Sequence, residues 1–426
     1  MIPRITIRKR YYIMKIDIPY GKEKIELNIP QENIQDIIQG GGTGWSADEK
    51  QIIEEALENP IGSPRLSKLA EEKSSAAILA SDITRPCPSY KFLPYLINEL
   101  RQGGIGKITI ILGLGIHRPH THEEKIKLAG QYAVENAAVI DSDPQRCKLI
   151  GTTSRGTPVE IFEEALKADL LIATGNIEYH YFAGYSGGAK AVMPGICTRR
   201  SIQANHCLML DERSAAGRAD GNPVREDIEE AGRIASIDYI FNVILDDNKK
   251  IMGAVAGANN EAWLEGIKKY DDIYMIEVDT TADIVIASAG GAPKDLNFYQ
   301  SQKALENVKD LVNPGGAIIL AASCHEGFGD DVFEEWMQDA TDYGFISKRL
   351  KENFVLGGHK AVAVARVISE KKALLYSEFD KITTEKMGFK KLDDIQSYLD
   401  TSIKENNDIK VTIVPCGRFA RVKSKP

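Results

Sequence analysis

The sequence predicts an α/β protein of two domains, each built on a mainly parallel sheet, with a cleft between them. Short apolar runs alternate with amphipathic helical patterns along most of the chain, as expected where helices cover both faces of a parallel sheet. The length of 426 residues corresponds to two or three domains of roughly 100–200 residues. Hydrophobic residues make up 43% and charged residues 27%, which are proportions of a globular and not of a disordered chain.

In the first half of the chain a strand, a turn and a helix follow one another repeatedly. The predicted strands, each a short apolar run, are 75–80, 107–113 and 168–174. The predicted helices are 90–101, 123–135 and 157–168. The last helix is expected to begin at a capping box of Thr157 and Glu160, with Pro158 at its first position.

A change of rhythm separates this series from a second one. Residues 237–257 read as two strands around an Asp-Asp-Asn turn. The later predicted strands are 282–288, 316–322, 360–366, 373–376 and 409–415. We therefore expect an N-terminal domain at 1–275 and a C-terminal domain at 276–407. The pattern leaves open whether the tail, 408–426, returns to the first domain.

Charge, cysteines and hydropathy exclude several classes of protein. The net charge is 53 − 61 = −8, which disfavours non-specific binding to nucleic acid. Six scattered cysteines without a CxxC pair indicate reduced thiols, not a disulfide framework or a zinc cage. No apolar run reaches the ~18 residues that span a membrane, and the N-terminus lacks a signal-peptide pattern. We expect a cytoplasmic protein without a membrane partner.

An unusual polar turn follows each of the first three predicted strands. These turns carry Asp82 and Arg85, then His117, then His180. Ligands of open α/β sheets bind at the carboxyl ends of the strands, so the four side chains are expected to converge in one crevice. The alternative is that they are ordinary turn and capping residues.

The segment HYFAGYSGGAK, residues 180–190, is the densest in polar and glycine residues. Gly184, Gly187 and Gly188, with Ser186 among them, indicate a phosphate cradle, although a structural turn explains them equally well. The segment is not a Walker loop, because alanine stands on both sides of Lys190. That lysine could be solvated, bind phosphate or act as a nucleophile.

Two predicted helices carry further candidates. His206 lies on a helix predicted at about 198–210, where it is a surface residue, a core residue or a metal ligand. No HExxH, HxH or CxxC pattern accompanies it, so a metal there needs donors from a cofactor. On a helix at 298–312, Tyr299, Gln300 and Lys303 lie away from the apolar stripe and suit a carboxylate, unless they form a plain solvated face. The histidines at 120, 122 and 359 are interpreted as surface or structural residues.

Taken together, these segments resemble the nickel-pincer lactate racemase family. The resemblance runs from about residue 59 to residue 358 and rests on the order and spacing of short motifs. These are NPIGSP (59–64), SDITRP (81–86), GIHRP (115–119), HYFAGYSGGAK (180–190), NH (205–206), YQSQKA (299–304) and HEGFG (325–329). The chain departs from the family pattern at Ile116, Tyr179 and Ala189, which leaves the substrate and the phosphate contacts open.

The resemblance implies a cofactor and a role for each candidate residue. The cofactor is nickel held by pyridinium-3,5-bisthiocarboxylic acid mononucleotide, with His206 as the protein ligand that completes a square-planar site. Lys190 is implied as the residue that can tether the nucleotide, and His117 and His180 as the paired acid and base. The other implied cofactor-binding residues are Asp82, Gly184, Ser186, Gly187 and Gly188. The implied substrate-binding residues are Arg85, Tyr299, Gln300 and Lys303.

The implied activity is racemisation or epimerisation of a 2-hydroxy acid, lactate or a relative, by reversible hydride transfer. A simple base cannot remove the weakly acidic C–H, whereas the cofactor can accept hydride while a base takes the hydroxyl proton. Implied partners are the hydroxy acid and proteins of cofactor biosynthesis. Two other functions stay open: a nucleotide-dependent transferase or ligase using loop 184–190, and a non-catalytic two-lobed carboxylate-binding protein.

Overall fold

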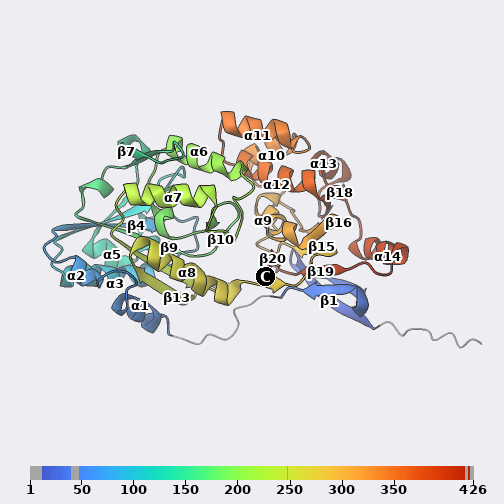
Figure 1. Ribbon diagram of the computed structural model, residues 1–426, viewed down its shortest axis with the longest axis horizontal. Coiled ribbons are helices and arrows are strands. Elements are labelled where there is room, and N and C mark those ends of the chain that lie inside the picture. Colours follow the sequence, from blue (N-terminus) through green and yellow to red (C-terminus); the bar gives the residue numbers. More distant parts are fainter. Residues whose placement is uncertain (1–11, 40–47, 247, 418–420, 423–426) are drawn as a thin grey trace, which may run out of the picture. The chain divides into compact units, whose positions relative to one another are not determined.

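The computed structural model describes residues 12–39, 48–246, 248–417 and 421–422, which form two compact units (Figure 1). One unit contains residues 48–274, and the other combines 12–39 with the described residues from 275 onward. Each unit has a six-stranded sheet, so the predicted α/β class with mainly parallel sheets is confirmed. No helix within these described ranges has the length and apolar character needed to cross a membrane.

The sheet of the 48–274 unit has the order β13-β12-β9-β4-β5-β6. Its strands are β4 (Ser75–Ser81), β5 (Lys107–Gly113), β6 (Ala138–Asp141), β9 (Leu170–Asn176), β12 (Tyr239–Leu245) and β13 (Ile251–Gly257). All neighbours are parallel except β12 and β13. Along the chain, β5 and β6 are added on one side of β4, and β9 is then added on the opposite side of β4. The topological switch point therefore lies between β4 and β9.

Helices cover both faces of this sheet, which explains why its strands are apolar along their whole length. Ile172 of β9 belongs to a core cluster with Phe92 and Leu96, whereas its neighbour Ala173 joins Trp263 on the other face. The helices are α1 (Glu49–Glu58), α2 (Leu66–Leu69), α3 (Ser89–Gln102), α4 (His122–Ala129), α5 (Gln131–Asn136), α6 (Arg199–Cys207), α7 (Pro223–Ile234) and α8 (Asn259–Tyr274). A separate ribbon is formed by β7 (Cys147–Thr152) and β8 (Pro158–Phe162).

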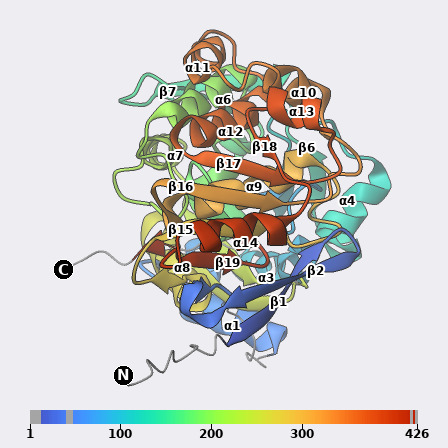
Figure 2. The same ribbon diagram turned by 90° about the vertical axis from the view of Figure 1, so that its right-hand side faces the viewer.

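The second sheet is parallel throughout and has the order β18-β17-β16-β15-β19-β3, most of which can be followed in Figure 2. Its strands are β3 (Ile34–Ile37), β15 (Ala282–Ser288), β16 (Val312–Ala321), β17 (Lys372–Tyr376), β18 (Lys390–Lys391) and β19 (Val411–Val414). The helices of this unit are α9 (Phe298–Val308), α10 (Asp331–Met337), α11 (Tyr343–Glu352), α12 (Gly358–Glu370), α13 (Lys381–Lys386) and α14 (Ile395–Glu405). A hairpin of β1 (Ile13–Tyr20) and β2 (Glu23–Pro30) packs on its core through alternate residues.

Three local predictions are wrong in the structure. The segment predicted as helix 157–168 is strand β8 followed by a single 3₁₀ turn, Ala165–Lys167; its buried β-branched residues Val159 and Ile161 favour a strand. The segment 360–366, predicted as a strand, lies inside α12, whose residues are buried on nearly every side and so hide the helical period. The helix predicted at 123–135 is interrupted at Gly130, which has φ = 84°.

The ends of the chain also pair differently from the expectation. Strand β19 of the tail lies between β15 and β3, so the tail belongs to the second sheet and does not return to the first domain. Strand β3 joins the same sheet, and Asn33 beside it donates to the carbonyl oxygens of Asn407 and Ile409. The expected N-terminal domain therefore loses its first segment to the other unit. Because β3 and β19 are so far apart in the sequence, no local sequence pattern predicts that they pair.

Candidate active site

The polar turns predicted to converge do follow neighbouring strands of the first sheet. Asp82 and Arg85 come directly after β4, and His117 comes after β5. His180 lies in the short strand β10 (Tyr179–His180), directly after β9, and β10 pairs with β11 (Gly184–Tyr185). Because β5, β4 and β9 are adjacent and parallel, these residues share the carboxyl edge on both sides of the switch point.

Asp82 and His117 form a close pair. Nδ1 of His117 lies 2.5 Å from Oδ2 of Asp82, and the hydroxyl of Thr84 donates to the other carboxylate oxygen at 2.8 Å. Burial by itself raises the pKa of Asp82, but the hydrogen bonds from His117 and Thr84, with the nearby charge of Arg85, hold it below the usual value. An ionised Asp82 fixes the proton of His117 on Nδ1, leaving the lone pair on Nε2. The side chain of Asp82 is 3% exposed and that of His117 37%, so the pair has a buried and an accessible end.

Phe182 brings together three residues that the sequence singled out separately. Its ring lies 4.5 Å from the ring of His180 and 5.0 Å from that of His206, both in edge-on contact. The amine of Lys190 lies 5.9 Å from the same ring. Phe182 is buried, and sequence reasoning missed it, although it stands within the motif between His180 and the glycines.

His180 is oriented by its own turn. The backbone N–H of Ala183 donates to Nδ1 of His180 at 3.3 Å. A nitrogen that accepts a hydrogen bond carries no proton, so the neutral ring holds its proton on Nε2; this tautomer is assigned from the bonding partner. His117 and His180 therefore present opposite states at Nε2, one with a lone pair and the other with a proton.

The environment of Lys190 favours a neutral amine. The residue is half-buried, and its amine lies over the ring of the buried Phe182. Burial lowers the pKa of Lys190 well below its usual value, and the charges of Arg85 and Arg225 lower it further, against the opposing charge of Glu178. A neutral amine is a nucleophile, so this surrounding fits a lysine that forms a covalent bond better than a solvated lysine.

The glycines of the loop lie in close contact with neighbouring backbone and side-chain atoms. A Cβ on Gly184 would lie 2.0 Å from the carbonyl oxygen of Arg218, and one on Gly187 would lie 2.8 Å from Oδ1 of Asn242. The N–H of Gly188 donates to the same Asn242 oxygen at 2.7 Å, so this N–H is bonded within the protein. Ser186 also bonds within the protein, donating to the carbonyl of residue 176 at 2.7 Å.

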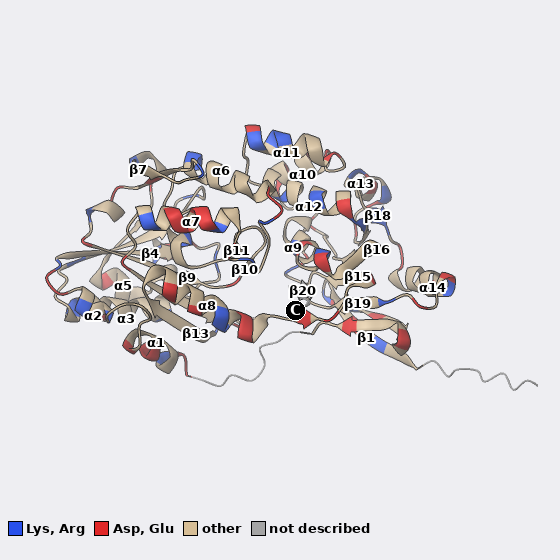
Figure 3. Ribbon diagram, in the orientation of Figure 1, with Lys and Arg blue, Asp and Glu red and all other residues tan. Residues whose placement is uncertain are grey.

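Two buried side chains, Arg225 of α7 and Trp263 of α8, donate hydrogen bonds to the backbone of the glycine loop. The guanidinium of Arg225 lies 3.6 Å from the ring centroid of Trp263 and donates to the carbonyl of Gly187 at 3.3 Å. The indole N–H of Trp263 donates to the carbonyl of Ser186 at 2.9 Å. Glu229 pairs with Arg225, and it is one of the acidic residues that colour α7 red in Figure 3. Neither Arg225 nor Trp263 stands in a motif, so sequence reasoning missed both.

His206 lies near the end of α6, a helix capped by the side chain of Thr198. It is 8% exposed, and its Nδ1 lies 3.1 Å from the amide oxygen of Asn205. Because that oxygen only accepts, the proton is on Nδ1 and Nε2 keeps the lone pair that a metal needs. Within the described part of the chain, no three His, Cys, Asp or Glu residues are placed to hold a metal together. A metal at His206 would therefore need donors beyond these side chains.

The remaining predicted substrate residues lie in the second unit. The side chain of Asn297 caps α9, and the exposed Lys303 donates to the amide oxygen of Gln300 at 3.0 Å. The amine of Lys360 lies 3.3 Å from the ring centroid of Tyr299 and donates to its carbonyl oxygen at 2.9 Å. Burial raises the pKa of the Tyr299 phenol, so the ring is a neutral hydrogen-bonding group.

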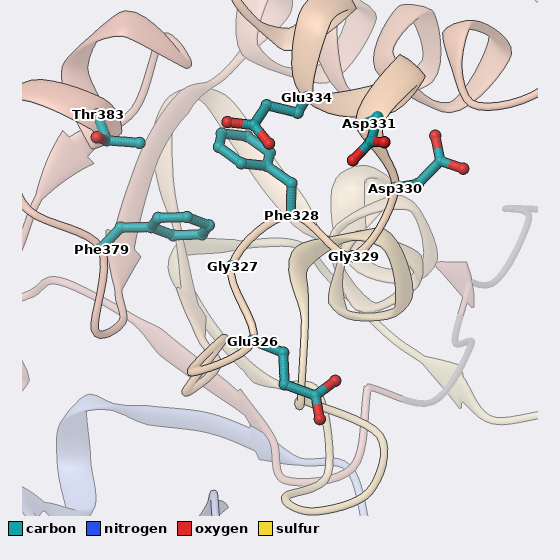
Figure 4. Close-up of a pocket in the computed structure, with 9 residues that line it drawn as sticks. All are labelled: Glu326, Gly327, Phe328, Gly329, Asp330, Asp331, Glu334, Phe379 and Thr383. Carbon is teal, nitrogen blue, oxygen red and sulfur yellow. The ribbon is translucent and has the colours of Figure 1, made fainter.

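The HEGFG motif borders a cavity of about 680 Å³ in the second unit (Figure 4). Figure 4 shows the rings of Phe328 and Phe379 facing its interior, with Glu334 beside them. Two further carboxylates, Asp330 and Asp331, belong to the lining. Acidic walls repel a carboxylate, so this cavity does not suit the carboxylate of a hydroxy acid.

Comparison with known proteins gives consistent results along the whole chain. Residues 20–217 match the model of the lactate racemase N-terminal domain, and residues 278–419 that of the lactate racemase C-terminal domain. The lactate racemase of Thermoanaerobacterium thermosaccharolyticum is 34% identical, with 96% of this chain and 99% of that protein covered. The lactate racemase of Lactiplantibacillus plantarum is 32% identical, with 96% and 100% covered.

Solved structures agree with these sequence matches. The lactate racemase apoprotein from Thermoanaerobacterium thermosaccharolyticum superposes with a TM-score of 0.87 at 34% identity, covering 96% of this chain and 100% of that one. A protein from Thermotoga maritima shares the fold, with a TM-score of 0.62 at 17% identity over 89% of this chain and 99% of that one.

Proposed function

The chain belongs to the lactate racemase family, and on this premise we propose that it racemises or epimerises a 2-hydroxy acid, lactate or a close relative. The single observation that carries the proposal is that the bonding partners of the two histidines assign them opposite states at Nε2. Nε2 of His117 has a lone pair, set by Asp82, while Nε2 of His180 has a proton, set by the backbone of Ala183. Inversion at one carbon needs a proton acceptor for one enantiomer and a proton donor for the other.

The residues present suit the nickel-pincer nucleotide that the family uses. His206 offers one imidazole with its lone pair on Nε2, and among the described residues no group of three or more His, Cys, Asp or Glu side chains is placed to hold a metal. This matches a metal whose other donors come from the cofactor. The low pKa of Lys190 suits a covalent link to the nucleotide. When bound, the cofactor supplies an acceptor for hydride, which the side chains of this protein lack.

In the proposed reaction the protein residues move the hydroxyl proton and hold the substrate. His117 takes the proton at Nε2, and the resulting imidazolium is stabilised by the ionised Asp82. His180 returns a proton from Nε2 when the other enantiomer forms. Arg85 is exposed and beside the same edge of the sheet, so its guanidinium is the proposed partner of the substrate carboxylate. Gln300, Lys303 and Tyr299 are proposed as further substrate contacts.

The two competing functions receive less support. A nucleotide-dependent transferase would use the glycine loop for phosphate, yet the N–H of Gly188 is already bonded to Asn242. A non-catalytic carboxylate-binding protein would need Arg85 and Lys303 but has no use for a low-pKa lysine or for histidines in opposite states.

The test is reconstitution with the nickel cofactor followed by isotope tracing. A panel of single enantiomers of 2-hydroxy acids would be incubated with the holoenzyme in D₂O, and the products separated by chiral chromatography. We expect one or more acids to be converted with no deuterium entering C2, because hydride transfer keeps the original hydrogen. Deuterium at C2 would instead indicate a carbanion route, and no conversion across the panel would refute the proposed function. The His117→Ala variant, loaded with the same cofactor, serves as the inactive control.

A further inference from the structure

His120 connects the turn after β4, which carries Asp82 and Arg85, to the turn after β5, which carries His117. The backbone N–H of Ile83 donates to Nε2 of His120 at 3.2 Å. On the other side of the ring, Nδ1 lies 2.7 Å from Oδ1 of Asp141, the last residue of β6. The His120 side chain is 1% exposed, so it is a core residue and not the surface residue that the sequence allowed.

The partners of His120 set its tautomer. A backbone N–H can only donate, so Nε2 must carry the lone pair and Nδ1 the proton, which points to Asp141. Asp141 is held in turn by the amine of Lys125 at 2.9 Å and by the backbone N–H of His120 at 3.2 Å. With both ring nitrogens engaged inside the protein, His120 cannot exchange a proton with a substrate. Its contacts suit a residue that sets position.

What His120 positions follows from the neighbours of Ile83. Asp82 stands directly before it, and Arg85 stands two residues after it on the same turn. The turn that contains His120 also carries His117, so the two turns are joined twice. One link is the bond from His117 to Asp82, and the other is the bond from Ile83 to His120. Within its own turn, Asp82 is held by Thr84 and by the N–H of Arg85, which bonds the Asp82 carbonyl at 3.1 Å, and neither contact fixes the turn against β5.

We propose that His120, oriented by Asp141, is a positioning residue that holds the Asp82–Arg85 turn in register with His117. The inference rests on the proposed function, since it assigns His117 and Arg85 to the reaction. Losing the Ile83 bond should let the turn shift at the end of β4. The Asp82 carboxylate would then align less well with His117, and the Arg85 guanidinium would move with it.

Two substitutions at position 120 separate positioning from packing. In His120→Gln the amide oxygen can reach the place of Nε2 and still accept from Ile83, while the contact with Asp141 is lost. In His120→Asn the amide reaches only the place of Nδ1, so it can donate to Asp141 but leaves the Ile83 N–H without its acceptor. Each variant loses one buried hydrogen bond, so a merely structural role predicts that they behave alike.

The first readout is independent of the cofactor. Imidazole ¹⁵N spectra of the apoprotein report the tautomer of His117, whose signals are assigned by their loss in His117→Ala. We expect His120→Gln to keep the wild-type His117 signals and His120→Asn to shift them toward a mixture of tautomers. After reconstitution, kcat should fall by up to about 100-fold in His120→Asn, the scale of a misplacement of about 1 Å. The same variant should raise KM through Arg85, while His120→Gln stays within a few-fold in both constants.

A second pair of variants covers the case in which position 120 tolerates no change. In Asp141→Asn the amide can donate to Nδ1 of His120, which places the ring proton on Nε2, facing the Ile83 N–H. We expect this variant to shift the His117 signals as His120→Asn does. The control is Lys125→Met, which removes the ion pair at Asp141 but keeps the tautomer, and it should give wild-type His117 signals.

The proposal is overturned if the His117 signals are unchanged in both His120→Asn and Asp141→Asn. It is equally overturned if His120→Gln and His120→Asn alter these signals to the same extent. Failure of the wild-type holoenzyme to convert any hydroxy acid would refute the proposed function alone. The spectra of the apoprotein would still decide whether His120 positions the turn.

Discussion

Substituting Asp82 by asparagine tests the hydrogen bond on which the assignment of His117 depends. In Asp82→Asn the hydroxyl of Thr84 favours the amide oxygen on its own side, so the amide N–H faces and donates to Nδ1 of His117. The imidazole proton then moves to Nε2, the atom that must accept the hydroxyl proton. The change keeps the size of a side chain that is 3% exposed, so the fold should survive it. Activity should fall because the base is in the wrong tautomer, not because the site is missing.

The magnitude follows from two losses. A hydrogen bond to a charged group contributes about 1.5–3 kcal/mol, so losing the carboxylate that stabilises the imidazolium costs about 10- to 150-fold in rate. The unfavourable tautomer adds to this, up to the ~10²–10⁴-fold expected when a general base is removed. We therefore expect kcat to fall by about 10²–10⁴-fold with a KM close to that of the wild type.

The assay follows conversion of one enantiomer by chiral chromatography, with cofactor content measured in the same sample. Thr84→Val is the matched control, because it removes the hydrogen bond to the other oxygen of Asp82 but leaves the bond to His117. That variant should lose less than about tenfold. A kcat of Asp82→Asn within threefold of the wild type, at equal cofactor content, would refute the role given to the pair.

Three further predictions concern the cofactor residues, the glycine loop and pH. His206→Ala should lose nickel, measured by elemental analysis, while Lys190→Ala should lose only the covalent adduct seen by intact-protein mass spectrometry; full nickel content in His206→Ala would contradict the ligand assignment. Gly188→Ala places a Cβ 2.9 Å from the guanidinium of Arg225, whereas the control Gly221→Ala, at a similar φ of +68°, places its Cβ in open space. Gly188→Ala should therefore lower the unfolding free energy by about 1–3 kcal/mol more than Gly221→Ala, as measured by urea unfolding. Folding lowers the pKa of Asp82, so its ionised carboxylate stabilises the protein at any pH above the pKa of the unfolded chain, about 4. This stabilisation is lost as the pH falls through the lower pKa of the folded protein. Urea unfolding should therefore show the difference between wild type and Asp82→Asn shrinking below about pH 4; a constant difference would contradict the assignment.

The sequence predicts the sheet strands well because their burial is local and continuous. Strand β5, for example, lies where the apolar run at 107–113 placed it. The edge of the sheet that carries His117 and His180 follows from the same pattern, since parallel strands end on one side. Polar residues that bond across the fold are harder to interpret. Thr157 and Glu160 resemble a helix cap, yet Glu160 accepts from Thr198 and pairs with Arg200 of α6.

The parts of the site that were missed depend on contacts without a sequence motif. Asn242 is an unremarkable polar residue of β12, and only the fold shows that its oxygen accepts from Gly188. His120 stands three residues after His117, but its bond to Ile83 depends on the pairing of β4 with β5. In both cases the residue type permits several roles, and its partner decides which role applies.

The pairing of β3 with β19 has a consequence for how the chain is made on the ribosome. Asn33 beside β3 bonds the backbone of Asn407, 374 residues later, so this strand waits for nearly the whole chain to be synthesised. At about 5–20 residues per second the wait is roughly 20–75 s. Residues 48–274 have emerged long before then, and their sheet needs no strand from either end of the chain. The unit that carries His117 and His180 can therefore fold while strand β3 still waits for strand β19.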